Sequence, residues 1–266
     1  MSATAGGRRV HKVHGAHNTF ALVDERLDGT APYGALARAL CSREHLAADG
    51  LLVVAESGEA GALARMRIFN ADGGEAEMCG NGVRCVARYL AERGAPSAFT
   101  IATTAGPIAA EILGRDPWSV RVGLGPVRRV EERALDLAGE RRAYVFVDVG
   151  NPHAVLFVPD VDAVDLAELG VRFAAQPEFP EGINVHVASI AGSAHLRARH
   201  YERGVGLTQA CGTGAVACAV AAMHAHGLHS PIAVDVPGGR LEVALEERQT
   251  WLTGPAEVEF ERTVAE

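Results

Sequence analysis

The chain has 266 residues, of which 48% are hydrophobic and 22% charged, and its formal net charge is -8 at pH 7. Such a composition is typical of a globular protein with one large domain or two smaller ones. No apolar run approaches the roughly 20 residues of a transmembrane helix, and the first residues lack the apolar stretch of a signal peptide. We therefore expect a cytoplasmic protein whose partner is a small molecule rather than a membrane or a nucleic acid.

The counts of lysine and cysteine restrict the chemistry further. Arginine accounts for 24 of the 25 basic residues, and Lys12 is the only lysine. A pyridoxal enzyme needs a lysine amine for its Schiff base, and a P-loop needs a lysine beside the phosphates, but Lys12 lies in a strand-like segment without a glycine-rich loop before it. The five cysteines include no CxxC pair, so neither disulfides nor a zinc ribbon is expected. We therefore expect no cofactor and no metal.

The predicted elements follow the same succession twice along the chain. Strand-like segments come first, a Cys-Gly-x-Gly turn follows at 79–82, and then come a helix over 83–93 and further strands. In the second half, strand-like runs such as 143–150 precede the same turn at 211–214 and a helix that starts at 215.

The two predicted helices differ in the pattern of their apolar residues. In the first helix, apolar residues occupy one face and Arg84, Arg88 and Glu92 lie elsewhere, which predicts some polar surface. Residues 215–223 are all apolar, so the second helix must be buried nearly all round. We therefore predict an α/β (α+β) fold of two domains, each a curved, mostly antiparallel sheet or barrel around a central helix.

The two halves of the chain are related by an offset of 132 residues, which aligns Cys79 with Cys211 and several glycines of one half with glycines of the other. An ordered series of matches at a nearly fixed offset indicates two homologous halves with pseudo-twofold symmetry. We predict an N-terminal half over 1–125 and a C-terminal half over 126–254, with the active site in the cleft between them. The last strand, within 255–266, is expected to pack back onto the first half.

Each Cys-Gly-x-Gly turn places a cysteine directly before a helix. The first N–H groups of a helix lack intrahelical acceptors and favour negative charge, so Cys79 and Cys211 are predicted to ionise more easily than a free thiol of pKa about 8.5. The flanking glycines would let a substrate carboxylate approach the same N–H groups. The other cysteines, Cys41, Cys85 and Cys218, are expected to be core residues.

The segments 65–85 and 199–219, which contain the two turns, resemble the two signature segments of the diaminopimelate epimerase family. The resemblance continues through HGAHNTF near the start, ADGLLVV at 48–54, TTAGPI at 103–108, VGNPHAVLF at 149–157 and FPEGINVHV at 179–187. It implies a homodimeric isomerase that needs no cofactor. The family reaction interconverts LL- and meso-diaminopimelate, in lysine and cell-wall precursor biosynthesis.

The resemblance also implies roles for individual residues. Cys79 and Cys211 would be the catalytic pair, one as thiolate and the other as thiol; in one direction Cys211 accepts the α-proton and Cys79 donates one, and the roles exchange in reverse. His153 and Glu202 would tune the thiol pKa values, since a cation favours a thiolate and an anion opposes it. The residues implied in substrate binding are Asn18, Asn70, Gly80, Asn81, Asn151, Asn184, Glu202, Arg203, Gly212 and Thr213.

Three departures from the family pattern concern the predicted rim of the pocket. Thr19 stands where an aspartate is usual, Leu207 replaces a frequent glutamate, and His45-Leu46-Ala47 replaces a more glycine-rich loop. They leave the two-base mechanism intact and keep open the racemisation of another amino acid. From different classes, a thiol redox or sensor protein could also keep two low-pKa cysteines, and a non-catalytic binding protein could keep the cleft.

Overall fold

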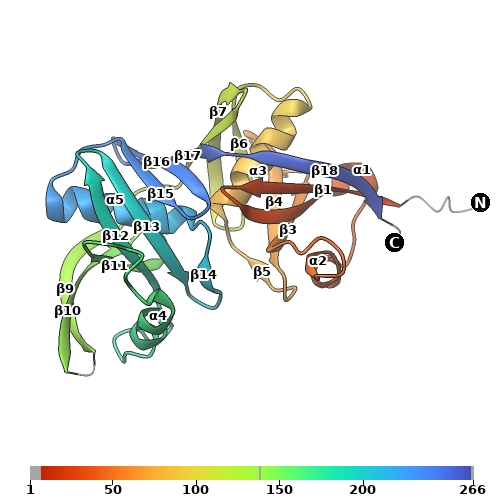
Figure 1. The fold of residues 1–266 in the computed structure, drawn as a ribbon. Helices are drawn as coiled ribbons and strands as arrows, with labels where there is room; N and C mark the ends of the chain where they lie inside the picture. The colour runs from red at the N-terminus through yellow and green to blue at the C-terminus, as the bar shows by residue number, and fades with distance from the viewer. Residues whose placement is uncertain (1–6, 138, 265–266) are drawn as a thin grey trace, which may run out of the picture. The chain divides into compact units, whose positions relative to one another are not determined.

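The computed structural model describes residues 7–137 and 139–264, and the chain divides into two compact units (Figure 1). The first unit takes in the described residues up to Val122 together with those from Gly254 onward, and the second unit is Gly123–Thr253. Among the described residues, no helix is both long enough and apolar enough to cross a membrane.

The first unit is built on a sheet in which the strands follow one another in the spatial order β18, β1, β2, β3, β4, β6, β7 and β8, with β5 beside the end of β4. Its strands are β1 (Arg8–Gly15), β2 (Asn18–Asp24), β3 (Gly50–Ala55), β4 (Ala62–Asn70), β5 (Glu75–Ala76), β6 (Ala98–Thr103), β7 (Gly106–Arg115), β8 (Trp118–Gly123) and β18 (Glu257–Val264). Its helices are α1 (Glu25–Asp28), α2 (Tyr33–Cys41) and α3 (Gly80–Glu92).

The second unit repeats this arrangement, with the spatial order β9, β10, β11, β12, β13, β15, β16 and β17 and with β14 beside the end of β13. Its strands are β9 (Arg129–Leu137), β10 (Glu140–Asp148), β11 (Pro152–Phe157), β12 (Asn184–Gly192), β13 (His195–Glu202), β14 (Gly206–Thr208), β15 (Ile232–Val236), β16 (Gly239–Glu246) and β17 (Gln249–Pro255). Its helices are α4 (Leu166–Ala174) and α5 (Gly212–His226).

The equivalence of the two units confirms the predicted pseudo-symmetric fold. Most neighbouring strands are antiparallel, as expected, but two pairs in each unit are parallel: β2 with β3 and β4 with β6 in the first, and β11 with β12 and β13 with β15 in the second. These parallel pairs were not predicted from the sequence. They arise because a helix connects the two strands of each pair, and such a crossover returns the chain in the same direction.

The sheet of the first unit is covered on both faces. Leu51 and Val53 pack with Leu40 of α2, whereas a Cβ built on Gly82 of α3 would lie 2.7 Å from Cδ2 of Leu52. Alternate residues of β3 therefore face opposite helices, which explains why the whole strand is buried.

The second unit has the same layers. Val185 and Val187 of β12 share a core with Phe173 of α4. The residue between the two valines, His186, faces α5, because a Cβ on Gly214 would lie 2.7 Å from its Cε1 atom. A strand position that is apolar in the first unit is therefore a buried histidine in the second.

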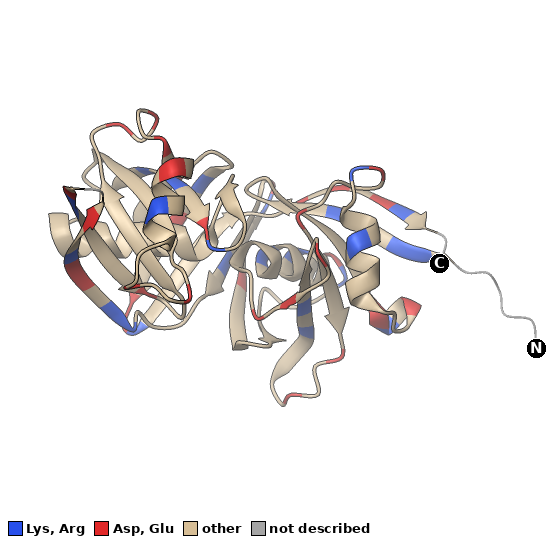
Figure 2. Ribbon diagram, turned by 90° about the horizontal axis from the view of Figure 1, so that it is seen from below, with Lys and Arg blue, Asp and Glu red and all other residues tan. Residues whose placement is uncertain are grey.

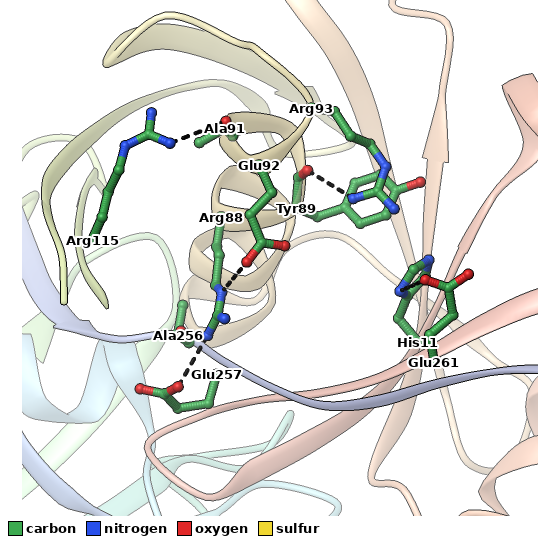
Figure 3. A network of polar contacts seen from close by, with 10 residues as sticks. All are labelled: His11, Arg88, Tyr89, Ala91, Glu92, Arg93, Arg115, Ala256, Glu257 and Glu261. Atoms are coloured by element: carbon green, nitrogen blue, oxygen red, sulfur yellow. Dashed lines mark hydrogen bonds and ion pairs between the residues drawn. The ribbon is translucent and has the colours of Figure 1, made fainter. Parts of the chain in front are cut away.

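The burial of the central helix agrees with the sequence for α5 and only in part for α3. Of the apolar residues over 215–223 in α5, those over 215–222 are buried and Met223 is half-buried, which confirms the predicted burial. For α3 the prediction of some polar surface is confirmed at Glu92, which is exposed, and in part at Arg88, whose side chain is 12% exposed, but it is wrong at Arg84, which is fully buried. The segment that leads into β18 covers this face and supplies acceptors: Arg84 donates to the Pro255 carbonyl at 3.3 Å, and Arg88 donates to the Ala256 carbonyl at 2.6 Å (Figure 3).

Charged residues of both signs are interspersed over each unit (Figure 2). Many of them form ion pairs along the strands, such as Glu131 of β9 with Arg129 and Arg133. In the first unit, Oε2 of Glu261 on β18 lies 3.5 Å from Nδ1 of His11 on β1 (Figure 3). The two residues are directly paired in the antiparallel register of these strands.

Candidate active site

Cys79 is the N-cap residue of α3, and its half-buried thiol faces the start of β2. Its backbone is extended, and its carbonyl accepts the first intrahelical hydrogen bond, from Val83 N–H at 2.9 Å. The thiol lies 3.9 Å from Oδ1 of Asn18, which also accepts a hydrogen bond from Nδ2 of Asn81 at 3.3 Å. Asn18 and Asn81, two residues predicted for the site, are therefore gathered around Cys79.

A carboxylate that the sequence analysis missed fixes the orientation of Asn18. Oδ2 of Asp49 accepts from Nδ2 of Asn18 at 3.0 Å and from the backbone N–H and hydroxyl of Thr19 at 2.7 and 3.0 Å. Because Asp49 can only accept, the amide nitrogen of Asn18 must point toward it, which turns the amide oxygen toward Cys79. Thr19, the departure from the family pattern, thus serves as a donor to Asp49.

A buried arginine underlies the same turn. Nη2 of Arg84 donates to Oδ1 of Asn81 at 2.9 Å, and this guanidinium is fully buried. Burial lowers the pKa of Arg84 to about 10, whereas the nearby thiols of Cys85 and Cys79 act in the opposite direction. The side chain therefore remains a cation at neutral pH.

Cys211 is the N-cap residue of α5 and is buried, with 4% exposure. Its Sγ accepts a hydrogen bond from Gly214 N–H at 3.3 Å and lies 3.6 Å from the hydroxyl of Thr213. Burial, followed by the charge of Glu202, raises the pKa of Cys211, whereas the contacts with Thr213 and Gly214 act in the opposite direction. The prediction that Cys211 ionises more easily than a free thiol is therefore wrong, because burial outweighs the helix start and holds the side chain mainly as a thiol.

His153 begins a chain of buried histidines in the second unit. Its Nε2 lies 2.8 Å from Oδ1 of Asn151 and its Nδ1 lies 2.7 Å from Nε2 of His186, while Nδ1 of His186 lies 2.9 Å from Nδ1 of His200. Burial lowers the pKa values of His153 and His200 to about 3 and also lowers the pKa of His186. The expectation that His153 supplies a cation to a thiolate is therefore wrong, because its ring is neutral at neutral pH.

The predicted binding residues at the ends of β12 and β13 are joined by backbone contacts. Asn184 donates through Nδ2 to the Pro152 carbonyl at 2.9 Å and accepts at Oδ1 from Arg203 N–H at 3.0 Å. Its side chain thus ties the loop of Asn151 to the turn that carries Arg203. The guanidinium of Arg203 is exposed and donates through Nη1 to the Glu181 carbonyl at 3.0 Å.

The other predicted residues occupy the helix starts and a turn. Gly80, Asn81, Gly212 and Thr213 belong to the first turns of α3 and α5, where backbone N–H groups point out of the helix end. Asn70 is exposed at the end of β4, and its backbone forms a turn with Gly73 and Gly74.

The remaining cysteines are core residues, as predicted. Cys41, Cys85 and Cys218 are free and buried. Burial raises the pKa of Cys41 to about 11 and that of Cys85 to about 12, and it also raises the pKa of Cys218. Unlike Cys79 and Cys211, none of the three caps a helix at its N-terminus.

The fold of two pseudo-symmetric units is shared with solved structures of other two-domain proteins. The fold is similar to that of a hydroxyproline epimerase from Agrobacterium vitis, with a TM-score of 0.73 and 16% identity over 99% of this chain and 93% of that chain. A phenazine biosynthesis protein of the PhzF family from Bacillus anthracis gives a TM-score of 0.73 and 18% identity over 97% of this chain and 98% of that chain.

Sequence comparison narrows the class to one family. Residues 10–130 and 145–259 match the family model of diaminopimelate epimerase. Diaminopimelate epimerase of Synechococcus sp. (strain JA-3-3Ab) is 38% identical, over 96% of this chain and 98% of the relative, and that of Rhizorhabdus wittichii is 43% identical, over 93% and 92%. The chain belongs to the diaminopimelate epimerase family.

Proposed function

We propose that this isomerase interconverts LL- and meso-diaminopimelate, in lysine and cell-wall precursor biosynthesis, by proton transfer between two cysteines and without a cofactor. The observation that carries the proposal is that each unit presents a cysteine outside any disulfide, Cys79 or Cys211, as the N-cap of its central helix. Inversion at a carbon requires a base on one face and an acid on the other, and two equivalent thiols provide both.

The proton transfers balance without an external reagent. The thiolate removes the α-proton, so an S–H bond forms while the C–H bond breaks, and the electron pair spreads from the α-carbon into the carboxylate. The other thiol then delivers its proton to the opposite face, so a C–H bond forms and that sulfur becomes the thiolate. In the reverse reaction the two cysteines exchange roles.

The environments of the two thiols support an unequal resting state. The buried cation of Arg84 favours the thiolate of Cys79, whereas burial and Glu202 raise the pKa of Cys211. We propose on this basis that Cys79 is the base and Cys211 the acid in the resting enzyme, and that the opposite ionisation serves the other direction.

Backbone N–H groups at the helix starts would stabilise the charge that develops on the substrate carboxylate. Gly80 and Asn81 belong to the first turn of α3, and Gly212 and Thr213 to that of α5. A single preorganised donor to an oxyanion contributes about 3 kcal/mol in other enzymes, so several donors could replace much of what pyridoxal supplies elsewhere.

The polar groups around these turns fit a substrate with ammonium and carboxylate groups. Glu202 can accept from an ammonium, and the exposed guanidinium of Arg203 can bind a carboxylate. The amides proposed to complete the binding site are Asn18, Asn70, Asn151 and Asn184.

Incubation with LL-diaminopimelate in D2O tests the proposal. The product should be the meso isomer with deuterium at the inverted α-carbon, and Cys79→Ser and Cys211→Ser should each lose most of this activity. Cys41→Ser, a buried cysteine outside the two caps, is the control and should retain it. Exchange with a different amino acid would identify a racemase of that amino acid, and absence of exchange with any amino acid would overturn the proposal.

The family resemblance supports two further proposals, a homodimer and a cytoplasmic location. Sedimentation should give twice the chain mass of 27.9 kDa. A monomer at micromolar concentration would overturn the first, and recovery of the native protein outside the cytoplasm in cell fractionation would overturn the second.

A further inference from the structure

The three buried histidines His153, His186 and His200 connect Asn151 to the residues that pack against the first turn of α5. His186 and His200 lie directly opposite each other in the pairing of β12 with β13, and their rings meet edge to face with centroids 4.8 Å apart. A Cβ on Gly214 would lie 2.7 Å from Cε1 of His186 and 2.9 Å from Nδ1 of His200. The turn that holds Cys211 therefore packs directly on this pair, and only glycine fits at the point of contact.

The hydrogen bonds determine where each ring carries its proton. All three rings are neutral, so each has one N–H donor and one bare nitrogen. Oδ1 of Asn151 accepts, so Nε2 of His153 must donate and its Nδ1 must be bare. It follows that Nε2 of His186 donates to His153, and that Nδ1 of His200 donates to His186.

The far end of the chain is consistent with this assignment. Nε2 of His200 is buried and has no hydrogen-bond partner among the described residues. With Nδ1 protonated, that atom is a lone pair rather than an N–H group, and an unpartnered buried acceptor is tolerated more readily than an unpartnered buried donor. Asn151 at one end of the histidine series and Nε2 of His200 at the other therefore indicate the same direction of hydrogen-bond donation, from His200 through His186 and His153 to Asn151.

We infer that His186 and His200 are positioning residues that make Asn151 a hydrogen-bond donor to an anionic group of the substrate. Because His153 donates to Oδ1 of Asn151, the amide nitrogen of this partly exposed side chain is turned away from the histidines and is available to a carboxylate. The inference rests on the proposed function for the identity of the substrate, and it assigns the carboxylate as the group that Asn151 binds.

Two substitutions of His186 by side chains of similar length distinguish a positioning role from a packing role. In His186→Gln the amide nitrogen can still donate to Nδ1 of His153, whereas His186→Met fills similar space without a donor. We expect kcat/KM for diaminopimelate to fall at least tenfold in His186→Met and to stay within threefold of the wild type in His186→Gln, with both variants folded by circular dichroism. Equal losses in the two variants of an active enzyme would overturn the inference, whereas an inactive wild type would instead overturn the proposed function.

The positions of the protons can be measured without any activity. Nitrogen-15 spectra of labelled histidine rings distinguish an Nε2–H ring from an Nδ1–H ring, and loss of a signal in His153→Asn, His186→Gln or His200→Gln identifies its source. We expect Nε2–H rings for His153 and His186 and an Nδ1–H ring for His200. The reverse pattern, with Nδ1–H at His153 and Nε2–H at His200, would mean that Asn151 presents its oxygen outward, and it would overturn the inference.

Discussion

Burying three neutral histidines makes the second unit sensitive to acid, and the size of the effect follows from the structure. The pKa values of His153 and His200 are lowered to about 3, and that of His186 is also lowered, whereas an unfolded histidine has a pKa of about 6.5. Between these limits the unfolded chain binds protons that the folded chain excludes, so stability is present above about pH 6.5 and is lost as the pH falls toward 3.

Each buried histidine should account for about 2 kcal/mol of the free energy of unfolding lost between about pH 7.5 and about pH 5, or about 6 kcal/mol for the three together. Over this range the result depends little on the folded pKa, because the folded rings stay neutral throughout. Urea denaturation of wild type and of His200→Gln at both pH values measures the effect as a difference between two losses. The variant should lose about 2 kcal/mol less than the wild type on acidification.

The matched control is His229→Gln, which changes an exposed histidine of the same unit. It should keep the pH dependence of the wild type. If His200→Gln lost as much free energy on acidification as the wild type and His229→Gln, the buried histidines would not be neutral in the folded state, and the tautomer assignment would fail with them.

Four further predictions concern the two helix starts. Arg84→Met should slow alkylation of Cys79 by iodoacetamide at neutral pH about tenfold, because the cation that favours the thiolate is gone, and Arg84→Lys should restore most of the rate. Oxidation should join Cys79 to Cys211 and abolish activity if both thiols reach one carbon; inactive oxidised protein without that linked peptide in mass spectrometry would contradict this. Gly214→Ala should cost about 1–3 kcal/mol in urea denaturation, since its methyl group overlaps a buried histidine ring, and an unchanged midpoint would show that the ring moves freely. Asp49→Ala should lower kcat/KM about tenfold, because the side chain of Asn18 and two donors of Thr19 lose their acceptor, and the amide of Asn18 lies beside the thiol of Cys79. An unchanged kcat/KM would exclude a positioning role for Asp49.

The features that the sequence predicted well are those encoded by local pattern. The nine apolar residues over 215–223 have no polar face to expose, so burial of the second central helix follows directly. The glycine-bracketed cysteines at 79 and 211 mark the helix starts because the pattern changes from turn to apolar helix at those positions. The repeat then extends both observations from one half of the chain to the other.

The features that were missed depend on segments that are distant in sequence. The apolar periodicity predicted that Arg84 lies on a polar face of the helix. It could not show that the Pro255 carbonyl and the Asn81 amide accept hydrogen bonds from a buried guanidinium. Likewise, His186 and His200 become neighbours only through the register of two strands, and their inward direction is set by the helix that packs on them. No local signal in the sequence distinguishes them from ordinary strand residues.

Asp49 illustrates a further limit. It lies in the loop before β3, thirty residues after Thr19, and an isolated aspartate in a loop is usually a turn residue. Its contact with Asn18 is created by the parallel pairing of β2 with β3, which the sequence analysis did not foresee.

The origin of the strand that flanks β1 has a consequence for the order in which the units can fold during synthesis. In the second unit the strand beside β10 is β9, which immediately precedes it in the chain. In the first unit the equivalent strand beside β1 is β18, which follows all the other described strands in the chain. Every strand of the second unit is therefore synthesised before the first unit has all of its own. The usual order, in which the N-terminal domain is completed first, is reversed. A ribosome that stalls after residue 255 would have synthesised every strand of the second unit but not β18, the strand that pairs with the β1 edge of the first unit.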